Sequence, residues 1–298
     1  MRALVTGATG FVGGLLARRL ATDGNEVRAL VRDRARADGL QGMELHEGDV
    51  LDADSLRGAG RGVDVAYYLV HGMGRGSDGD FAERERRAAR NFARMAASEG
   101  VGRAVYLGGL GEKPASEHLR SRHETAVILA GEGPPLTYFR AAMVIGAQSE
   151  SYRTLRYLVK RLPVMIAPAW LQTPTQPIAA EDAVSYLAAA PEVPESEGRE
   201  VQIGGPDVVS YGEMLDRMAM AMGLRPRPKL PVPAISPWLS SHWIGLVTPV
   251  DAGVARPLVE GLSTETVVTD PSGAEAFDIE PVGVDEALRT ALLEDDAD

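Results

Sequence analysis

The 298-residue sequence contains no cysteine. Disulfides, thiolate nucleophiles and zinc or iron–sulfur sites held by cysteine are therefore excluded. Its five histidines do not fall at a metal-ligand spacing such as His-Glu-x-x-His, and we expect no metal site. The sequence also lacks a Gly-x-Ser-x-Gly elbow and a Walker turn with its lysine, which argues against hydrolase and kinase chemistry.

Basic residues are fewer than acidic ones in this sequence. The chain has 31 Lys and Arg against 42 Asp and Glu, a formal net charge of -11, which disfavours nonspecific attraction to nucleic acid or to anionic membranes. The most apolar long stretch, 230–262, contains five prolines, so no transmembrane segment is predicted. The first residues show no secretory signal pattern, and we expect a cytoplasmic protein.

Short apolar runs alternate with amphipathic segments up to about residue 146. Predicted strands cover 2–6, 26–32, 43–46, 64–70, 104–107 and 136–139, and predicted helices cover 11–20, 80–98 and 116–130. The run 64–70 is apolar nearly throughout, which is typical of a strand buried on both faces of a parallel sheet. The alternation predicts an α/β fold, a doubly wound parallel-sheet Rossmann fold.

The rhythm changes after residue 146. We predict helices over 152–161, 181–190, 211–222 and 284–293, a strand over 199–203, a proline-punctuated loop over 163–177 and irregular structure over 226–257. This divides the chain into a dinucleotide-binding core, 1–150, to which 176–205 returns, and a smaller C-terminal substrate lobe, 151–175 with 206–298. The apolar cluster around Trp238 and Trp243 belongs either to the packing of that lobe or to a pocket for an apolar substrate.

A glycine-rich turn joins the first predicted strand to the first predicted helix. Its glycines are Gly7, Gly10 and Gly13, and the turn also contains Thr9, Phe11 and Val12. In such a turn the first glycine permits the tight bend, the second lets the backbone approach a phosphate, and the third lets helix and strand pack closely. The amides of the helix N-terminus then face the anion, so the sequence predicts a dinucleotide site here.

The end of the second strand bears on the choice of dinucleotide. A carboxylate there suits the ribose hydroxyls of NAD(H), whereas an arginine suits the 2′-phosphate of NADP(H). Arg32 and Asp33 are adjacent, with Arg28 and Arg34 nearby. Because Arg32 comes first after the strand, we favour NADP(H) over NAD(H); an arginine at a solvated strand end is the competing interpretation.

The runs Val5–Gly13, Val27–Asp33, Glu47–Val50 and Tyr67–His71 together resemble the atypical and extended short-chain dehydrogenases/reductases. The likeness is to the NAD(P)H-binding, NmrA-like branch and to the Rossmann-type accessory subunit of complex I, and it covers about residues 1–205. It implies that Asp49 and Val50 lie beside the adenine and that Leu69, Val70 and His71 line the cofactor. It also implies that Arg140 lies near the nicotinamide. Asp182 matches a segment that returns to the core, where a plain helix N-terminal carboxylate is the alternative.

The sequence departs from this family in its catalytic set. Members usually carry Ser or Thr after the fifth strand and a Tyr-x-x-x-Lys pair on the next helix. Here Gly108-Gly109 ends the strand, and His118 and Arg122 occupy the tyrosine and lysine places. His118 is the candidate proton donor and Arg122 a candidate ribose ligand, with Ser121 and His123 as further candidates.

Two functions remain open at this point. One is an NADPH-dependent oxidoreductase of a small carbonyl, enone or quinone-like substrate, and the other is a redox-silent NAD(P)H sensor or assembly protein. We expect a small, apolar substrate for the first. The helix predicted over 80–98 offers a dimer face, but its apolar side, with Phe81 and Ala88, is needed against the sheet, so both monomer and homodimer stay open.

Overall fold

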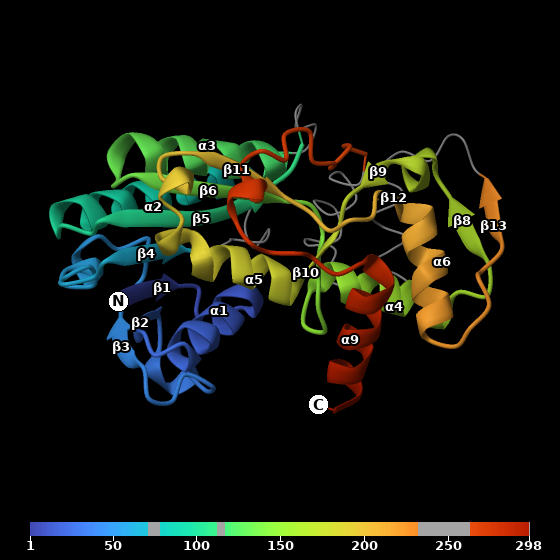
Figure 1. The fold of residues 1–298 in the computed structure, drawn as a ribbon, viewed down its shortest axis with the longest axis horizontal. Helices are drawn as coiled ribbons and strands as arrows, with labels where there is room; N and C mark the ends of the chain where they lie inside the picture. The colour runs from blue at the N-terminus through green and yellow to red at the C-terminus, as the bar shows by residue number, and fades with distance from the viewer. Residues whose placement is uncertain (71–77, 112–116, 232–262, 298) are drawn as a thin grey trace.

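A seven-stranded parallel sheet forms the centre of the molecule (Figure 1). The computed structural model describes residues 1–70, 78–111, 117–231 and 263–297. The strand order is β11-β6-β5-β4-β1-β2-β3. The strands are β1 (Arg2–Thr6), β2 (Glu26–Val31), β3 (Glu44–Glu47), β4 (Val65–Tyr68), β5 (Arg103–Gly109), β6 (Leu136–Ala141) and β11 (Glu200–Ile203). The chain winds outward in both directions from β1 and β4, so the predicted doubly wound Rossmann fold is confirmed.

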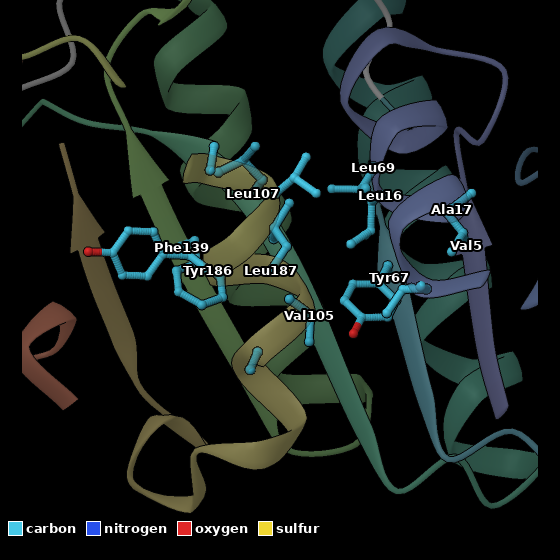
Figure 2. Close-up of a cluster of buried hydrophobic side chains, with 14 of the residues drawn as sticks. Val5, Leu16, Ala17, Tyr67, Leu69, Val105, Leu107, Phe139, Tyr186 and Leu187 are labelled. Carbon is cyan, nitrogen blue, oxygen red and sulfur yellow. The ribbon is translucent and has the colours of Figure 1, made fainter. Parts of the chain in front are cut away.

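Helices cover both faces of the sheet. α1 (Phe11–Thr22) and α5 (Ala180–Ala189) lie on one face, and α2 (Asp78–Ser98) and α3 (Glu117–Glu132) lie on the other (Figure 1). Figure 2 shows the first interface, where Val5, Tyr67 and Val105 of the sheet face Leu16 of α1 and Leu187 of α5. Burial on both sides explains why the strands read as continuous apolar runs rather than as alternating ones.

A third buried cluster forms away from the sheet. It lies among α4 (Glu150–Arg161), α6 (Tyr211–Ala221) and α9 (Val284–Ala297), and includes Tyr152 and Met218. Its edges carry the strand pairs β7 (Val144–Ile145) with β10 (Ile178–Ala179), β8 (Met165–Ala167) with β13 (Lys229–Pro231), and β9 (Pro174–Thr175) with β12 (Val209–Ser210). The 3-10 turns are η1 (Arg34–Arg36), η2 (Asp54–Leu56), η3 (Ala169–Gln172), η4 (Ala190–Glu192), η5 (Pro194–Ser196) and η6 (Ala274–Ala276).

The segment 163–177 differs from the sequence prediction of a loop, because it contains β8 and β9. Each is only two or three residues long and pairs with a segment more than thirty residues away in sequence. Such strands are stabilised by tertiary pairing, so the local pattern does not reveal them. The residues around Trp238 and Trp243 lie outside the described part. No helix within the described ranges has the length and apolar character needed to span a membrane.

Candidate functional site

A cavity of about 480 Å³ opens where β1, β2, β3 and β4 reach their carboxyl ends. Residues that the sequence assigned to a cofactor form half of its lining: Gly7, Thr9, Gly10, Arg32, Asp49, Val50, Leu69 and Val70. The sequence analysis did not assign the remainder: Leu30, Val31, Gly48, Leu51, Phe81, Arg84, Glu85 and Ala88. In doubly wound sheets, ligands bind outside the carboxyl ends of the strands, at the point where the strand order reverses. The cavity lies at this point, beside β1 and β4.

Two glycines of the turn, Gly7 and Gly13, have no room for a side chain. Gly7 has φ +71°, and a Cβ there would lie 2.5 Å from the carbonyl oxygen of Leu69. A Cβ at Gly13 would lie 2.2 Å from the carbonyl oxygen of Gly7. At Gly10 a Cβ would meet only the Gly7 oxygen, at 3.1 Å, and Gly10 also lines the cavity. The turn therefore leaves its outer side open to a ligand.

The N-terminus of α1 is electrostatically uncompensated. Gly10 is its N-cap and offers no side-chain acceptor to the first amides, and the first turn carries no acidic residue. The positive end of the helix dipole therefore faces the cavity edge at Gly10. A diphosphate fits this arrangement, because it supplies the acceptors and the negative charge that the chain itself omits. Phe11, Val12 and Gly13 form the first turn itself and do not line the cavity.

A buried hydroxyl joins the two central strands beneath the turn. Thr6 Oγ1 donates to the carbonyl oxygen of Tyr67 at 3.0 Å and accepts from the amide of Leu69 at 3.1 Å. Thr6 is fully buried. These bonds fix the end of β1 against the end of β4, where the cavity begins.

The loop after β3 is held from two sides. The Asp49 amide donates to Ser55 Oγ at 2.9 Å, and Asp49 Oδ1 accepts from the Leu51 amide at 2.9 Å. Asn91 of α2 donates from Nδ2 to the carbonyl oxygen of Val50, also at 2.9 Å. The backbone that presents Asp49 and Val50 to the cavity is therefore fixed by η2 and α2.

The charged residues at the end of β2 have different surroundings. Arg32 is exposed, lines the cavity and, within the described ranges, has no ion-pair partner. Asp33 points its Oδ1 at the Ala35 amide, 2.9 Å away, as the cap of η1. Arg34 pairs with Glu47 at 3.4 Å, and Arg28 is buried against backbone carbonyl groups. Arg32 is thus the one member of this group that lines the cavity.

One wall of the cavity comes from α2, and sequence reasoning missed it. Phe81, Arg84, Glu85 and Ala88 follow the i, i+3, i+4, i+7 spacing of one helical face. The sequence analysis predicts that Phe81 and Ala88 pack against the sheet, and it assigns no role to Arg84 or Glu85. The first turns of α2 extend past the end of β4, so this part of the face borders the cavity instead.

The ends of β5 and β6 are closely filled. A Cβ at Gly108 would lie 2.7 Å from Tyr138 Cε2 and 2.8 Å from its hydroxyl oxygen, and a Cβ at Gly109 would lie 2.6 Å from Leu119 Cδ2. Burial raises the pKa of the Tyr138 phenol to about 12, against the opposing charge of Arg140. Neighbouring side chains therefore occupy the space that a side chain at either glycine would need.

Arg140 holds the segment that follows β5. Its Nε donates to the carbonyl oxygen of Gly109 at 3.1 Å and its Nη2 to that of Gly111 at 2.7 Å. Its Nη1 pairs with Glu200 at 2.6 Å, and the side chain is 12% exposed. Arg140 does not line the cavity, and its visible contacts are structural.

Helix α3 carries the remaining candidates. The carbonyl oxygen of Arg122 accepts from the Tyr106 hydroxyl at 3.3 Å, and the Arg122 charge opposes the rise that burial causes in the pKa of Tyr106. Ser121 is buried and His123 is exposed. The side chain of His118 and all of His71 lie outside the described part of the chain. None of the described residues of α3 lines the cavity.

Asp182 has a structural partner. Its Oδ2 accepts from the Val282 amide at 2.9 Å, and burial raises the pKa of its carboxyl. It lies in the first turn of α5, which matches the interpretation as a helix N-terminal carboxylate.

Among the described residues, no group of three or more His, Asp or Glu side chains is placed to hold a metal ion.

Comparison with known proteins agrees with this geometry. Residues 7–133 match the model of a family described as NAD(P)H-binding. The alpha subcomplex subunit 9 of mitochondrial NADH dehydrogenase from Arabidopsis thaliana is 26% identical over 288 residues, covering 90% of this chain and 71% of that protein.

Two solved structures share the fold. Triphenylmethane reductase of Citrobacter sp., complexed with NADP(H), has a TM-score of 0.78 at 18% identity and covers 98% of this chain and 100% of its own. The NADPH-dependent quinone oxidoreductase of Escherichia coli has a TM-score of 0.72 at 18% identity, covering 97% and 98%. The predicted resemblance is thus confirmed at this level: residues 7–133 form an NAD(P)H-binding domain, the chain is homologous to the complex I subunit, and it shares its Rossmann fold with the two reductases.

Proposed function

We propose that this protein is an NADPH-dependent oxidoreductase of a small carbonyl, enone or quinone-like substrate. The observation that carries the proposal is the cavity at the N-terminus of α1, which combines the glycines of the turn, several apolar side chains and Arg32, which has no ion-pair partner among the described residues. The fold neighbours are a triphenylmethane reductase and a quinone oxidoreductase, which supports a reductase acting on a small molecule.

Different residues along the edge of the sheet would contact different parts of the dinucleotide. Gly7, Thr9 and Gly10 would hold the diphosphate, and Arg32 the 2′-phosphate. Loop residues Asp49 and Val50 would border the adenine, and Leu69, Val70 and His71 would continue the site toward β5. When bound, a reduced nicotinamide supplies a hydride. In this proposal the His118 imidazole, or water, donates the proton that completes reduction of a carbonyl oxygen to a hydroxyl.

Arg122 would take the place of the family lysine. An arginine does not pass its proton on as a lysine can, so Arg122 would hold ribose hydroxyls without taking part in proton transfer. Proton donation would then fall to His118 or to water.

A binding assay tests the cofactor site directly. In the Gly10→Val variant the new Cβ meets the Gly7 oxygen at 3.1 Å, and the variant should bind NADPH at least tenfold more weakly than wild type, with circular dichroism used to check that it is folded. The Arg32→Ala variant should lose most of its preference for NADPH over NADH. Arg36→Ala is the matched control, since Arg36 follows the same strand but does not line the cavity. Unchanged affinity in Gly10→Val would refute the site.

An activity assay tests the chemistry. Purified protein should oxidise NADPH in the presence of at least one member of a quinone and aldehyde panel. His118→Ala should abolish this turnover and leave NADPH affinity unchanged, and His123→Ala, on the exposed side of α3, should retain it. Equal activity in all three proteins would exclude His118 as the proton donor.

A redox-silent NAD(P)H sensor or assembly protein is the second candidate. The filled positions at Gly108 and Gly109 favour it, because no hydroxyl of the usual catalytic set has room there. The homologous plant protein is itself a subunit of NADH dehydrogenase, which is consistent with a role in an assembly. Tight NADPH binding without turnover on any substrate of the panel would support this candidate against the first.

A further inference from the structure

We infer that Arg84 on α2 is a second specificity-determining cation, which acts together with Arg32 on the 2′-phosphate of a dinucleotide. This inference rests on the proposed preference for NADP(H). Arg32 follows β2 and Arg84 lies on α2, fifty-two positions later in the sequence, yet both line the same cavity. Two guanidinium groups from separate elements are suited to the dianionic 2′-phosphate of NADP(H). The 2′-hydroxyl that NAD(H) carries at the same place is uncharged and needs neither guanidinium.

The other arginines of α2 show why Arg84 stands apart. Arg86 pairs with Glu124 at 2.9 Å, and Arg90 and Arg94 pair with Glu132 at 3.5 Å and 2.8 Å. These side chains join α2 to α3, and their charge is compensated within the chain. Arg84 is exposed on the cavity face and, among the described residues, makes neither an ion pair nor a hydrogen bond. Its charge is therefore available to a ligand.

The position of Arg84 is fixed before any ligand binds. Ala88, one turn further along the same face, is 4% exposed and belongs to the core between α2 and the sheet. The hydrogen bond from Asn91 to the carbonyl oxygen of Val50 attaches the helix to the loop after β3. When an anion binds, the side-chain torsions of Arg84 have to be ordered but its backbone does not, which limits the entropic cost to that of one side chain.

Two carboxylates also line the cavity, and they offer Arg84 another role. Asp49 uses Oδ1 to accept the Leu51 amide, and Glu85 is the neighbour of Arg84 on the helix. If Arg84 only balanced these negative charges, its removal would weaken every adenine nucleotide equally. If it contacts the 2′-phosphate, the loss would be confined to ligands that carry this group.

The test is a titration of the full chain with 2′,5′-ADP, 5′-AMP, NADPH and NADH. Arg84→Ala should weaken 2′,5′-ADP and NADPH by about tenfold and change 5′-AMP and NADH less than about twofold. Arg87→Ala is the matched control, an exposed arginine of the same helix that does not line the cavity, and its affinities should equal those of wild type. Alanine is a strong helix former, so both variants should fold.

The Arg32→Ala variant separates the two proposals. Because both arginines would contact one phosphate, the double variant should lose less affinity than the product of the single losses. If Arg32→Ala weakens the binding of 2′,5′-ADP and Arg84→Ala does not, the role inferred for Arg84 is wrong and the proposed NADP(H) preference stands. If neither variant weakens the binding of 2′,5′-ADP, both the role of Arg84 and the NADP(H) preference are wrong. An equal loss for 5′-AMP and 2′,5′-ADP in Arg84→Ala would also overturn the inference.

Discussion

The two ends of the crevice above the sheet are built differently. At the end formed by β1 to β4, Thr6, Ser55 and Asn91 fix the backbone, while Arg32 and Arg84 line a cavity. At the β5–β6 end the polar groups are satisfied within the protein: the Arg140 guanidinium holds two carbonyl oxygens and a carboxylate.

Under the proposed function, this contrast places cofactor binding and catalysis in separate parts of the fold. The proposed binding end combines the glycine-rich turn with the side chains of Arg32 and Arg84. The catalytic end of related enzymes depends on a particular hydroxyl, for which Tyr138 leaves no room beside Gly108. Four substitutions test how independent the two ends are, and they follow in order of expected effect.

The largest effect is expected from Gly13→Val, at the binding end. Its Cβ would lie 2.2 Å from the Gly7 oxygen, and relief requires α1 to move away from the turn. We expect the free energy of unfolding in urea to fall by more than about 3 kcal/mol and nucleotide binding to disappear. Gly131→Ala, with no atom within 4 Å of the new Cβ, should be neutral or slightly stabilising. An unchanged urea midpoint for Gly13→Val would contradict this account of the turn.

The second substitution, Arg140→Met, removes the guanidinium at the other end. Loss of its bonds to Gly109, Gly111 and Glu200 should destabilise the fold by about 2 to 3 kcal/mol. The affinity for 5′-AMP should stay within a factor of about two, because Arg140 does not line the cavity. Chemical denaturation and nucleotide titration measure the two quantities separately. A parallel fall in 5′-AMP affinity would show that the two ends are coupled.

The third, Gly108→Ser, tries to restore the missing hydroxyl. The new Cβ meets the ring of Tyr138, so we expect a loss of about 1 to 2 kcal/mol in denaturation experiments and no gain of carbonyl reduction. Gly108→Ala should lose as much stability, since the clash comes from the Cβ. A Ser variant that is stable and newly active would show that the ring moves aside.

The smallest effect is expected from Tyr138→Phe and depends on pH. Burial raises the pKa of the folded-state phenol to about 12, above its unfolded value of about 10. The neutral phenol contributes fully below pH 10, and this stability is lost as pH rises toward 12. Between pH 9 and pH 11 the free energy of unfolding of wild type should fall by about 1 kcal/mol more than that of the Phe variant. If urea denaturation shows the same fall for both proteins, the phenol does not contribute in this way.

Local signals were sufficient to predict most of the core. The apolar runs of β1 and β4, the glycine spacing of the first turn and the amphipathic pattern of α2 each reflect one element, so sequence reasoning identified them. The short strands β8 and β9 were not predictable, because their partners are distant in sequence and a run of two or three residues carries no period.

Only part of the candidate site produces a local sequence signal, so only that part was predictable. Gly7, Gly10 and Arg32 follow strand ends directly, and their position at the cavity follows from the parallel sheet. Arg84 was missed because nothing local distinguishes a helix face that packs on a sheet from one that extends past its edge. The partners of Arg140 were equally hidden, since its hydrogen bonds reach two carbonyl groups about thirty residues earlier in the chain.

The Thr6 hydroxyl has a consequence for the thermodynamics of nucleotide uptake. Its two bonds join β1 to β4 within the chain, so the fold itself sets the spacing of the strand ends that border the crevice. If a dinucleotide binds at the proposed site without moving these strands, association should follow a single kinetic phase whose rate is proportional to nucleotide concentration, and the heat-capacity change should reflect the apolar surface that the nucleotide buries.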